Sequence, residues 1–394
     1  MTGVCSADSC LRYLTASLLA IFLAIFLYQT FQIATLPGSD GLPAGLGYIS
    51  DEVWYVSAAR NILHDFFKTP AASQYYTTTE SCIAGGTVVK RYSHIDVATV
   101  EGDVTCYTRR GYPYPDREGI LNYYNLEHPP LVKYILAAVL ATRDEPFFWR
   151  LPSMAVGAAT LLLVYLAARR LAGRLWALAA CGLMLLDRTF VAMSSVAMLD
   201  IYLAFFTALL AYMYPRPLAV GTALGLAASV KYSGLFPIFG LTYLYARWNM
   251  WHLLAVSLAA ASIFLLVNMP IAIQLGLGRW IHEIQAAISW HTTSRPPGPT
   301  ASSPLDWLIM RNNFALYLNP DIYAGGTLVY LVALIYAAYR RDDLSILYLS
   351  TYGGYWLVYA AGNHTLYSFY TAHFSPLAHI VLARFLHHLT ARRG

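Results

Sequence analysis

Residues 11–34 read LRYLTASLLAIFLAIFLYQTFQIA, an apolar run that contains a single charged residue, Arg12. A helix that crosses a bilayer needs about 20 mostly apolar residues, so this run predicts a membrane span, which we expect to be a permanent anchor. The composition agrees, because 58% of the 394 residues are apolar and only 12% are charged. Soluble proteins carry about 25% charged residues. Nine further runs predict spans, and the ten together are 11–34, 147–168, 175–193, 196–214, 217–230, 233–246, 251–269, 323–339, 344–361 and 366–386.

The arginines orient these spans. Basic residues collect in the short cytoplasmic connections of membrane proteins. If the N-terminus is cytoplasmic, the connections on that side hold Arg12, Arg169, Arg170, Arg174, Arg216, Arg247, Arg340, Arg341, Arg392 and Arg393. The sequence therefore predicts a single all-α polytopic membrane domain, residues 1–394.

Two segments outside the spans are long, and this topology places both on the outer side. Residues 35–127 form the first outer loop and residues 271–322 the second. The first contains a helical pattern from Asp51 to about residue 63, and a shorter helix is expected after His128-Pro129-Pro130, to about residue 142. Tyr-, Thr- and Gly-rich residues 70–118 suit short strands or irregular structure. Long loops of this kind are usually functional.

The first outer loop also holds two of the five cysteines, Cys82 and Cys106. The outer face of a membrane is an oxidising environment in which disulfides form. The sequence leaves open whether these two residues pair.

Charged residues gather at the outer ends of the spans and in the two outer loops. Because a charge beside lipid is costly, each needs a partner, a wet cavity or a function. Simpler interpretations stay open: Ser50 can cap a helix that begins with acids, Arg150 and Lys231 can extend to lipid head groups, and Asp187 can pair with Arg188. Asp200 can cap the fourth span. A polar vestibule under both loops accounts for the whole set more simply.

Several function classes are excluded or disfavoured. A net charge of +5 is too small to indicate a basic surface for nucleic acid. The sequence also contains no glycine-rich phosphate-binding loop of the kind that would predict a nucleotide site. The histidines His364, His373 and His379 show no metal-ligand spacing, so we expect no metal, although assistance by a divalent cation stays open. A transporter or flippase would place ionisable groups near the bilayer midplane or on broken helices, whereas these lie at one face.

An ordered series of motifs resembles the protein O-mannosyltransferases, which are membrane-embedded C-type glycosyltransferases. The series spans roughly residues 45–390. It consists of Asp51-Glu52, Glu127-His128-Pro129-Pro130-Leu131-Val132-Lys133, Phe148-Trp149-Arg150-Leu151-Pro152, Met198-Leu199-Asp200, Val230-Lys231-Tyr232-Ser233-Gly234-Leu235, Ser302-Ser303-Pro304-Leu305-Asp306-Trp307, Arg311, Leu318-Asn319-Pro320 and Tyr367 to Pro376. The chain departs from the family at Val132, where glycine is usual, and has ten predicted spans where the family has eleven.

The resemblance implies the C-type glycosyltransferase fold and sugar transfer from a polyprenyl (dolichyl) phosphate, with mannose as the expected sugar. Transfer to a Ser or Thr hydroxyl of a protein requires a base, and positive charge must stabilise the departing phosphate. Direct displacement would invert the anomeric centre. The resemblance assigns Asp51 as the base and Glu52 as its neighbour, and we expect Lys231, Arg311 and Arg150 to bind the phosphate. His128 and His291 are expected at the sugar or acceptor, with Asp200 orienting a cation.

The sequence leaves several points open. A related C-type enzyme that acts on a lipid or glycan would show the same pattern, and whether the chain forms a dimer is undetermined. A small chain without an added luminal domain suggests the plasma membrane of a prokaryote, in particular an archaeon, with the active site outside the cell. The donor lipid, the acceptor and the membrane lipids are the expected partners, and no soluble cofactor is implied.

Overall fold

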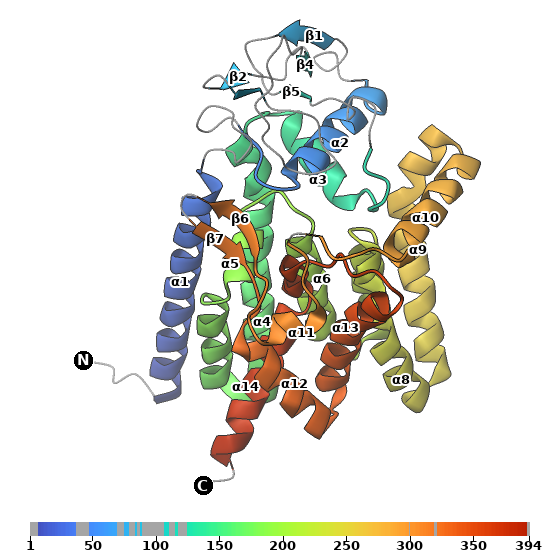
Figure 1. Ribbon diagram of the computed structural model, residues 1–394. Helices are drawn as coiled ribbons and strands as arrows, with labels where there is room; N and C mark the ends of the chain where they lie inside the picture. Colours follow the sequence, from blue (N-terminus) through green and yellow to red (C-terminus); the bar gives the residue numbers. More distant parts are fainter. Residues whose placement is uncertain are drawn as a thin grey trace.

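The computed structural model describes residues 7–36, 47–68, 75–78, 83–84, 87–88, 106–109, 115–116, 124–298, 300–318 and 321–391. Helices dominate these residues, so the predicted all-α class is confirmed. The long helices form a bundle, and α2 (Glu52–Asp65), α3 (Leu131–Leu140) and short strands lie at one end of it (Figure 1). The beginning of α1 (Ala7–Ala34) and the end of α14 (Ser375–Ala391) lie at the other end.

The remaining helices follow in chain order. They are α4 (Pro146–Met184), α5 (Arg188–Met193), α6 (Asp200–Met213), α7 (Pro217–Ala228), the 3-10 helix η3 (Tyr232–Leu235), α8 (Ile238–Trp248), α9 (Met250–Leu275), α10 (Leu277–Thr292), α11 (Pro304–Leu308), α12 (Leu328–Arg340), α13 (Asp343–Ala360) and the 3-10 helix η4 (Ser368–His373).

The element α4 consists of two helical arms joined by a sharp turn. Gly173 adopts φ 81° and ψ 176° at that turn, a conformation that glycine tolerates because it has no Cβ. The Cys181 thiol lies 3.5 Å from the carbonyl oxygen of Leu161. In a straight helix these two residues would be about 30 Å apart, at 1.5 Å of rise per residue. The arms therefore run back along each other, as the two predicted spans 147–168 and 175–193 require.

Several helices are shorter than the spans predicted for them. Of the helices in the described residues, α1, α4 and α9 are long and apolar enough to cross a membrane by length and composition. The third predicted span is interrupted between α4 and α5, and the fourth begins only at Asp200 because Leu199 is its N-cap. The last one divides into η4 and α14. The number of membrane crossings stays a prediction.

Both outer loops contain secondary structure. In the first, β1 (Tyr75–Thr78) pairs antiparallel with β4 (Cys106–Arg109), which pairs with β5 (Pro115–Asp116). The two-residue strands β2 (Ile83–Ala84) and β3 (Thr87–Val88) form a separate pair. These strands agree with the expectation of short strands in residues 70–118. Cys82 lies outside the described residues, so its pairing with Cys106 stays a prediction.

The second outer loop contains α10 and α11, followed by the strand β6 (Phe314–Leu318), which pairs with β7 (Asp321–Ala324). Ser303 and Asp306 form a capping box at the start of α11, and the Trp307 indole donates to the Ser302 hydroxyl at 2.8 Å. This part of the family-like motif therefore holds a local turn together. Asn319 and Pro320 lie outside the described residues.

Candidate functional site

Asp51 and Glu52 begin α2, but their environments differ. The backbone of Ser50 has φ 53°, a left-handed conformation that is uncommon for residues other than glycine. Asp51 is the N-cap of α2, yet its side chain makes no capping hydrogen bond and is partly exposed. The interpretation of Ser50 as the helix cap is therefore wrong. Glu52 is fully buried.

Glu52 forms a closed ion pair with Arg150. The Arg150 Nε and Nη2 atoms each lie 2.8 Å from a carboxylate oxygen of Glu52. The same carboxylate accepts hydrogen bonds from the backbone N–H groups of Ile49 at 2.7 Å and Ala197 at 2.8 Å. Glu52 therefore connects the start of α2 to α4 and to the segment before α6.

Arg150 uses all of its donors within the protein. Besides Glu52, its guanidinium donates to the carbonyl oxygens of Ala34 at 2.9 Å, Leu36 at 3.2 Å and Gly47 at 3.2 Å. A guanidinium has five N–H donors, and these contacts occupy them all. A donor phosphate could reach Arg150 only by displacing one of these partners. Arg150 is also fully buried, so the interpretation that it extends to lipid head groups is wrong.

The second buried ion pair, between Lys231 and Asp200, is more open. The Lys231 ammonium lies 3.0 and 3.2 Å from the two carboxylate oxygens of Asp200. It also lies 4.3 Å from the centre of the Tyr370 ring, which is close enough for a cation–π contact. Within the described residues, these groups and the more distant Phe369 ring are its side-chain partners. Asp200 contacts a cation, as expected. The interpretation that Lys231 extends to lipid head groups is wrong, because Lys231 is buried.

The backbone after Lys231 is fixed by close packing. A Cβ atom on Gly234 would lie 2.4 Å from the carbonyl carbon and oxygen of Ala227, closer than such atoms approach. The absence of a side chain at Gly234 therefore allows η3 to pack against α7. This contact holds the chain that carries Lys231, and it gives a physical reason for glycine in the string Lys231-Tyr232-Ser233-Gly234.

Tyr55 lies within the electrostatic influence of both Asp51 and Asp200. It stands one helical turn after Asp51 on α2, so both side chains lie on the same face of the helix. Burial raises the pKa of Tyr55 well above its usual value, and the negative charges of Asp51 and Asp200 raise it further. Because both charges act on this hydroxyl, Asp51 lies in the same region as the Lys231–Asp200 pair.

His128 and His291 face each other across the two outer loops. Their rings stack with centroids 5.7 Å apart, and the His128 ring lies 6.1 Å from that of Tyr55. Burial lowers the pKa of His291 to about 4, and burial lowers that of His128 well below 6.5, with the positive charge of Lys231 acting in the same direction on both. Both imidazoles are therefore neutral at pH 7.

The buried Lys133 ammonium holds the segment that carries His128. It donates to the carbonyl oxygens of Tyr124 at 3.0 Å, of His128 at 2.6 Å, and of Asn125. Burial lowers the pKa of Lys133 to about 7. Sequence reasoning quoted this lysine in a motif but gave it no role.

Among the described residues, no contact joins the Arg311 side chain to this cluster. Arg311 lies in the exposed turn after α11, where its side chain makes no hydrogen bond or ion pair with any described residue. A cation of the second outer loop that does act on the cluster is Arg295. Its positive charge lowers the pKa of His291, although burial and the charge of Lys231 contribute more to that shift. The Arg295 guanidinium stacks 3.4 Å from the centre of the Trp290 ring. Nothing in the sequence singled out Arg295 among the loop cations.

Two further buried polar groups connect elements that sequence reasoning did not join. Asp144 accepts from the Arg60 guanidinium at 2.8 and 2.9 Å and from the Trp149 indole at 2.8 Å. Asp187 caps α5 and accepts from the hydroxyls of Tyr330 and Ser375, both at 2.6 Å. The predicted ion pair between Asp187 and the exposed Arg188 is therefore wrong.

Metal binding stays open. Among the described residues, no group of three or more His, Cys, Asp and Glu side chains is arranged to hold a metal ion. The pairs Glu52–Arg150 and Asp200–Lys231 each place a carboxylate against a cation instead.

Residues 142–285 match the family model described as dolichyl-phosphate-mannose-protein mannosyltransferase. A protein of Saccharomyces cerevisiae, dolichyl-phosphate-mannose–protein mannosyltransferase 1, is 29% identical over 189 residues, covering 39% of this chain and 23% of that protein. Over this part of its length the chain is similar to the protein O-mannosyltransferases, as the motifs predicted. The family match includes Arg150, Asp200 and Lys231, and it ends before His291 and begins after His128.

Solved structures support the fold. ArnT from Cupriavidus metallidurans bound to undecaprenyl phosphate matches with a TM-score of 0.55 at 15% identity, covering 92% of this chain and 59% of that chain. The oligosaccharyltransferase of Archaeoglobus fulgidus matches with a TM-score of 0.53 at 14% identity, covering 97% of this chain and 52% of that one. The predicted C-type glycosyltransferase fold is thus confirmed, and the chain is an integral membrane protein. It spans about a quarter of the yeast protein and little over half of either structure.

Proposed function

We propose that the chain is a glycosyltransferase that moves a sugar from a polyprenyl phosphate to a hydroxyl group, with inversion at the anomeric carbon. The observation that carries this proposal is the convergence of Asp51, the Lys231–Asp200 pair and the two stacked histidines. These residues come from segments distant in the sequence, and together they supply a candidate base and a candidate phosphate-binding cation. The chain shares its fold with ArnT, whose solved structure contains bound undecaprenyl phosphate, and this supports a polyprenyl-phosphate donor.

In this mechanism Asp51 acts as the general base. It is the acid whose carboxylate is partly exposed, whereas Glu52 is committed to Arg150. Asp51 accepts the proton of the acceptor hydroxyl while that oxygen forms its bond to the anomeric carbon. The bond from the anomeric carbon to the phosphate oxygen breaks, and the electron pair leaves with the phosphate. Groups of this kind contribute about 10²- to 10⁴-fold to rates.

Lys231 stabilises the departing phosphate. Its ammonium is buried beside Asp200, where charge interactions are stronger than in water. Asp200 orients Lys231, and the donor phosphate, bound beside this ammonium, adds a second negative partner. His128 and His291, both neutral, contact the sugar or the acceptor by hydrogen bonds. Glu52 and Arg150 act as positioning residues that hold the start of α2, and Arg311 keeps only a peripheral role.

We further propose mannose as the sugar and Ser or Thr of a protein as the acceptor, because the family model and the yeast relative carry those names. The arginine distribution supports an extracytoplasmic site. The acidic residue at position 51 would then face the outer side.

The test uses the purified full chain in lipid nanodiscs with a polyprenyl-phosphate mannose donor. Three acceptors are offered in parallel: a Ser/Thr-rich peptide, a glycan and a lipid with a free hydroxyl. We expect mannosyl peptide of inverted configuration, as read by NMR of the anomeric proton. Transfer only to the glycan or the lipid would replace the protein acceptor, and no transfer from any polyprenyl-phosphate sugar would overturn the proposal.

A further inference from the structure

Tyr55 of α2 is a buried residue with an unused hydroxyl. Its side chain is 3% exposed, and its ring packs against that of His128 with centroids 6.1 Å apart. Among the described residues, no group forms a hydrogen bond with the Tyr55 hydroxyl. Buried polar groups usually have a hydrogen-bond partner, because a missing one costs free energy. This hydroxyl can therefore form a hydrogen bond with a ligand.

The start of α2 is tied to the segment that carries Asp200. Glu52 accepts a hydrogen bond from the backbone N–H of Ala197 at 2.8 Å, and Ala197 lies three residues before Asp200. Tyr55 lies one helical turn after Asp51, so its side chain leaves α2 on the same face as the proposed base. Tyr55 therefore lies beside Asp51 and near the segment of Asp200.

The neighbour of Tyr55 in the first outer loop, His128, belongs to a segment that is tied to Lys231. The backbone N–H of Leu131 donates to the carbonyl oxygen of Ser229 at 3.1 Å. Leu131 lies three residues after His128. Ser229 lies two residues before Lys231. Tyr55 is thus placed between the proposed base and the proposed phosphate-binding cation.

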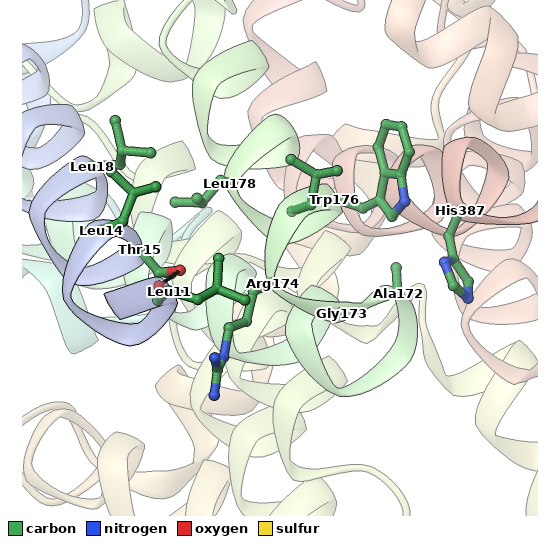
Figure 2. A pocket seen from close by; sticks show the side chains of 11 residues that line it. Leu11, Leu14, Thr15, Leu18, Ala172, Gly173, Arg174, Trp176, Leu178 and His387 are labelled. Carbon is green, nitrogen blue, oxygen red and sulfur yellow. Dashed lines mark hydrogen bonds between the residues drawn. The ribbon is translucent and has the colours of Figure 1, made fainter. Parts of the chain in front are cut away.

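The cavity shown in Figure 2 is separate from this cluster. It has a volume of about 400 Å³ and lies between the beginning of α1, the turn of α4 and the end of α14. These parts lie at the end of the bundle opposite to α2 (Figure 1). A ligand of the Tyr55 hydroxyl is therefore to be sought within the cluster itself.

The Tyr55 hydroxyl keeps its proton at neutral pH. Burial raises its pKa well above the usual value, and the negative charges of Asp51 and Asp200 raise it further. The hydroxyl is therefore a hydrogen-bond donor and not a base. In the proposed reaction, negative charge develops on the phosphate oxygen when its bond to the anomeric carbon breaks. A hydrogen-bond donor that is already in place stabilises such charge strongly where water is excluded.

We propose that Tyr55 donates a hydrogen bond to the phosphate oxygen that leaves the anomeric carbon. This inference rests on the proposed function and adds a neutral donor to the charge of Lys231. Tyr55 keeps its proton throughout, since Asp51 receives the proton of the acceptor hydroxyl and the electron pair of the broken bond stays on the phosphate. The product, a polyprenyl phosphate, carries more negative charge than the donor, because a phosphate monoester has a second ionisation near pH 6. Tyr55 therefore binds the product more strongly than the donor.

The experiment compares Tyr55→Phe with wild type, using the purified full chain in lipid nanodiscs. This change removes the hydroxyl and keeps the ring that packs on His128. We expect the single-turnover rate with polyprenyl-phosphate mannose to fall about 10- to 150-fold, the contribution of a hydrogen bond to a charged group. The affinity for undecaprenyl phosphate should fall more than the affinity for the donor. The thermal midpoint should stay at the wild-type value, because the hydroxyl bonds no described residue.

Tyr336→Phe is the matched control. Tyr336 of α12 is 6% exposed and packs against Phe385, and α12 lies far from α2 in the bundle (Figure 1). This variant should keep the wild-type rate and affinities. A wild-type rate and product affinity in Tyr55→Phe would overturn this inference and leave the proposed function standing, as would equal losses in both variants. A wild-type chain that neither binds undecaprenyl phosphate nor transfers sugar would overturn the proposed function, and this inference with it.

Discussion

Two of the buried ion pairs among the described residues differ in how completely the protein satisfies them. Glu52–Arg150 is closed, since the guanidinium spends its five donors on protein oxygens and the carboxylate accepts two backbone N–H groups in addition. Lys231–Asp200 is less completely enclosed, since the Lys231 side chain is 8% exposed and the ammonium lies against the Tyr370 ring on another side. The difference supports the proposal that the first pair holds the fold and that the second receives a charged ligand.

The largest effect is expected when the neighbouring acids are exchanged for their amides. Asp51→Asn should reduce the transfer rate by about 10²- to 10⁴-fold, because it removes the base. Donor binding should stay near wild type, and thermal stability should fall less than in Glu52→Gln, because Asp51 is partly exposed whereas Glu52 is fully buried. Initial rates and donor Kd for the purified variant check this. Full activity in Asp51→Asn would remove the proposed base.

Glu52→Gln should show the opposite pattern, a loss of stability. Removing one charge of a buried pair leaves the other uncompensated, which costs about 3–5 kcal/mol. The measurement is the thermal midpoint in a fixed detergent, compared with Asp51→Asn as the adjacent control. If Glu52→Gln were as stable as wild type and inactive, the division between the two acids would be contradicted.

Lys231→Met should raise the donor KM or Kd at least tenfold, because a phosphate contact of this kind contributes about 1.5–3 kcal/mol. It also leaves Asp200 buried without its cation. The double variant with Asp200→Asn should therefore recover stability without recovering donor binding. Recovery of both would show that Lys231 serves the fold alone.

The stacked histidines predict a loss of stability in acid. The unfolded chain binds a proton at His291 below about pH 6.5, whereas the folded chain resists protonation until about pH 4. The unfolded state therefore gains protons first, and stability falls as the pH drops from 6.5 towards 4. The thermal midpoint of His291→Gln should fall less steeply over this range than that of wild type. Parallel curves would contradict the buried, neutral imidazole.

The smallest effect is expected for Arg311→Gln. An exposed side chain without partners among the described residues contributes within about 0.5 kcal/mol. Arg295→Gln is the matched comparison, because Arg295 lies close enough to act on His291. Donor and acceptor KM values for both variants check this order. A larger loss for Arg311→Gln would restore its predicted role at the phosphate.

The sequence alone predicted those features that depend on hydropathy and on the order of motifs along the chain. Apolar runs located the helices, and the motifs identified Asp51, Lys231 and Asp200 as members of one region. It could not reveal that Arg150 pairs with Glu52, because the two residues are far apart in the chain and an arginine at a helix start has many partners available. It also gave no role to Arg295, which is four residues from His291, because the position of His291 beside His128 arises only from tertiary packing.

The most direct test is a structure of the full chain with a polyprenyl-phosphate sugar bound. The account predicts that the phosphate lies within hydrogen-bonding distance of the Lys231 ammonium, with the anomeric carbon facing the Asp51 carboxylate across a space for a hydroxyl. Glu52 and Arg150 should keep their contacts to each other. A donor whose phosphate is bound away from Lys231, or whose sugar is separated from Asp51 by protein, would contradict the account.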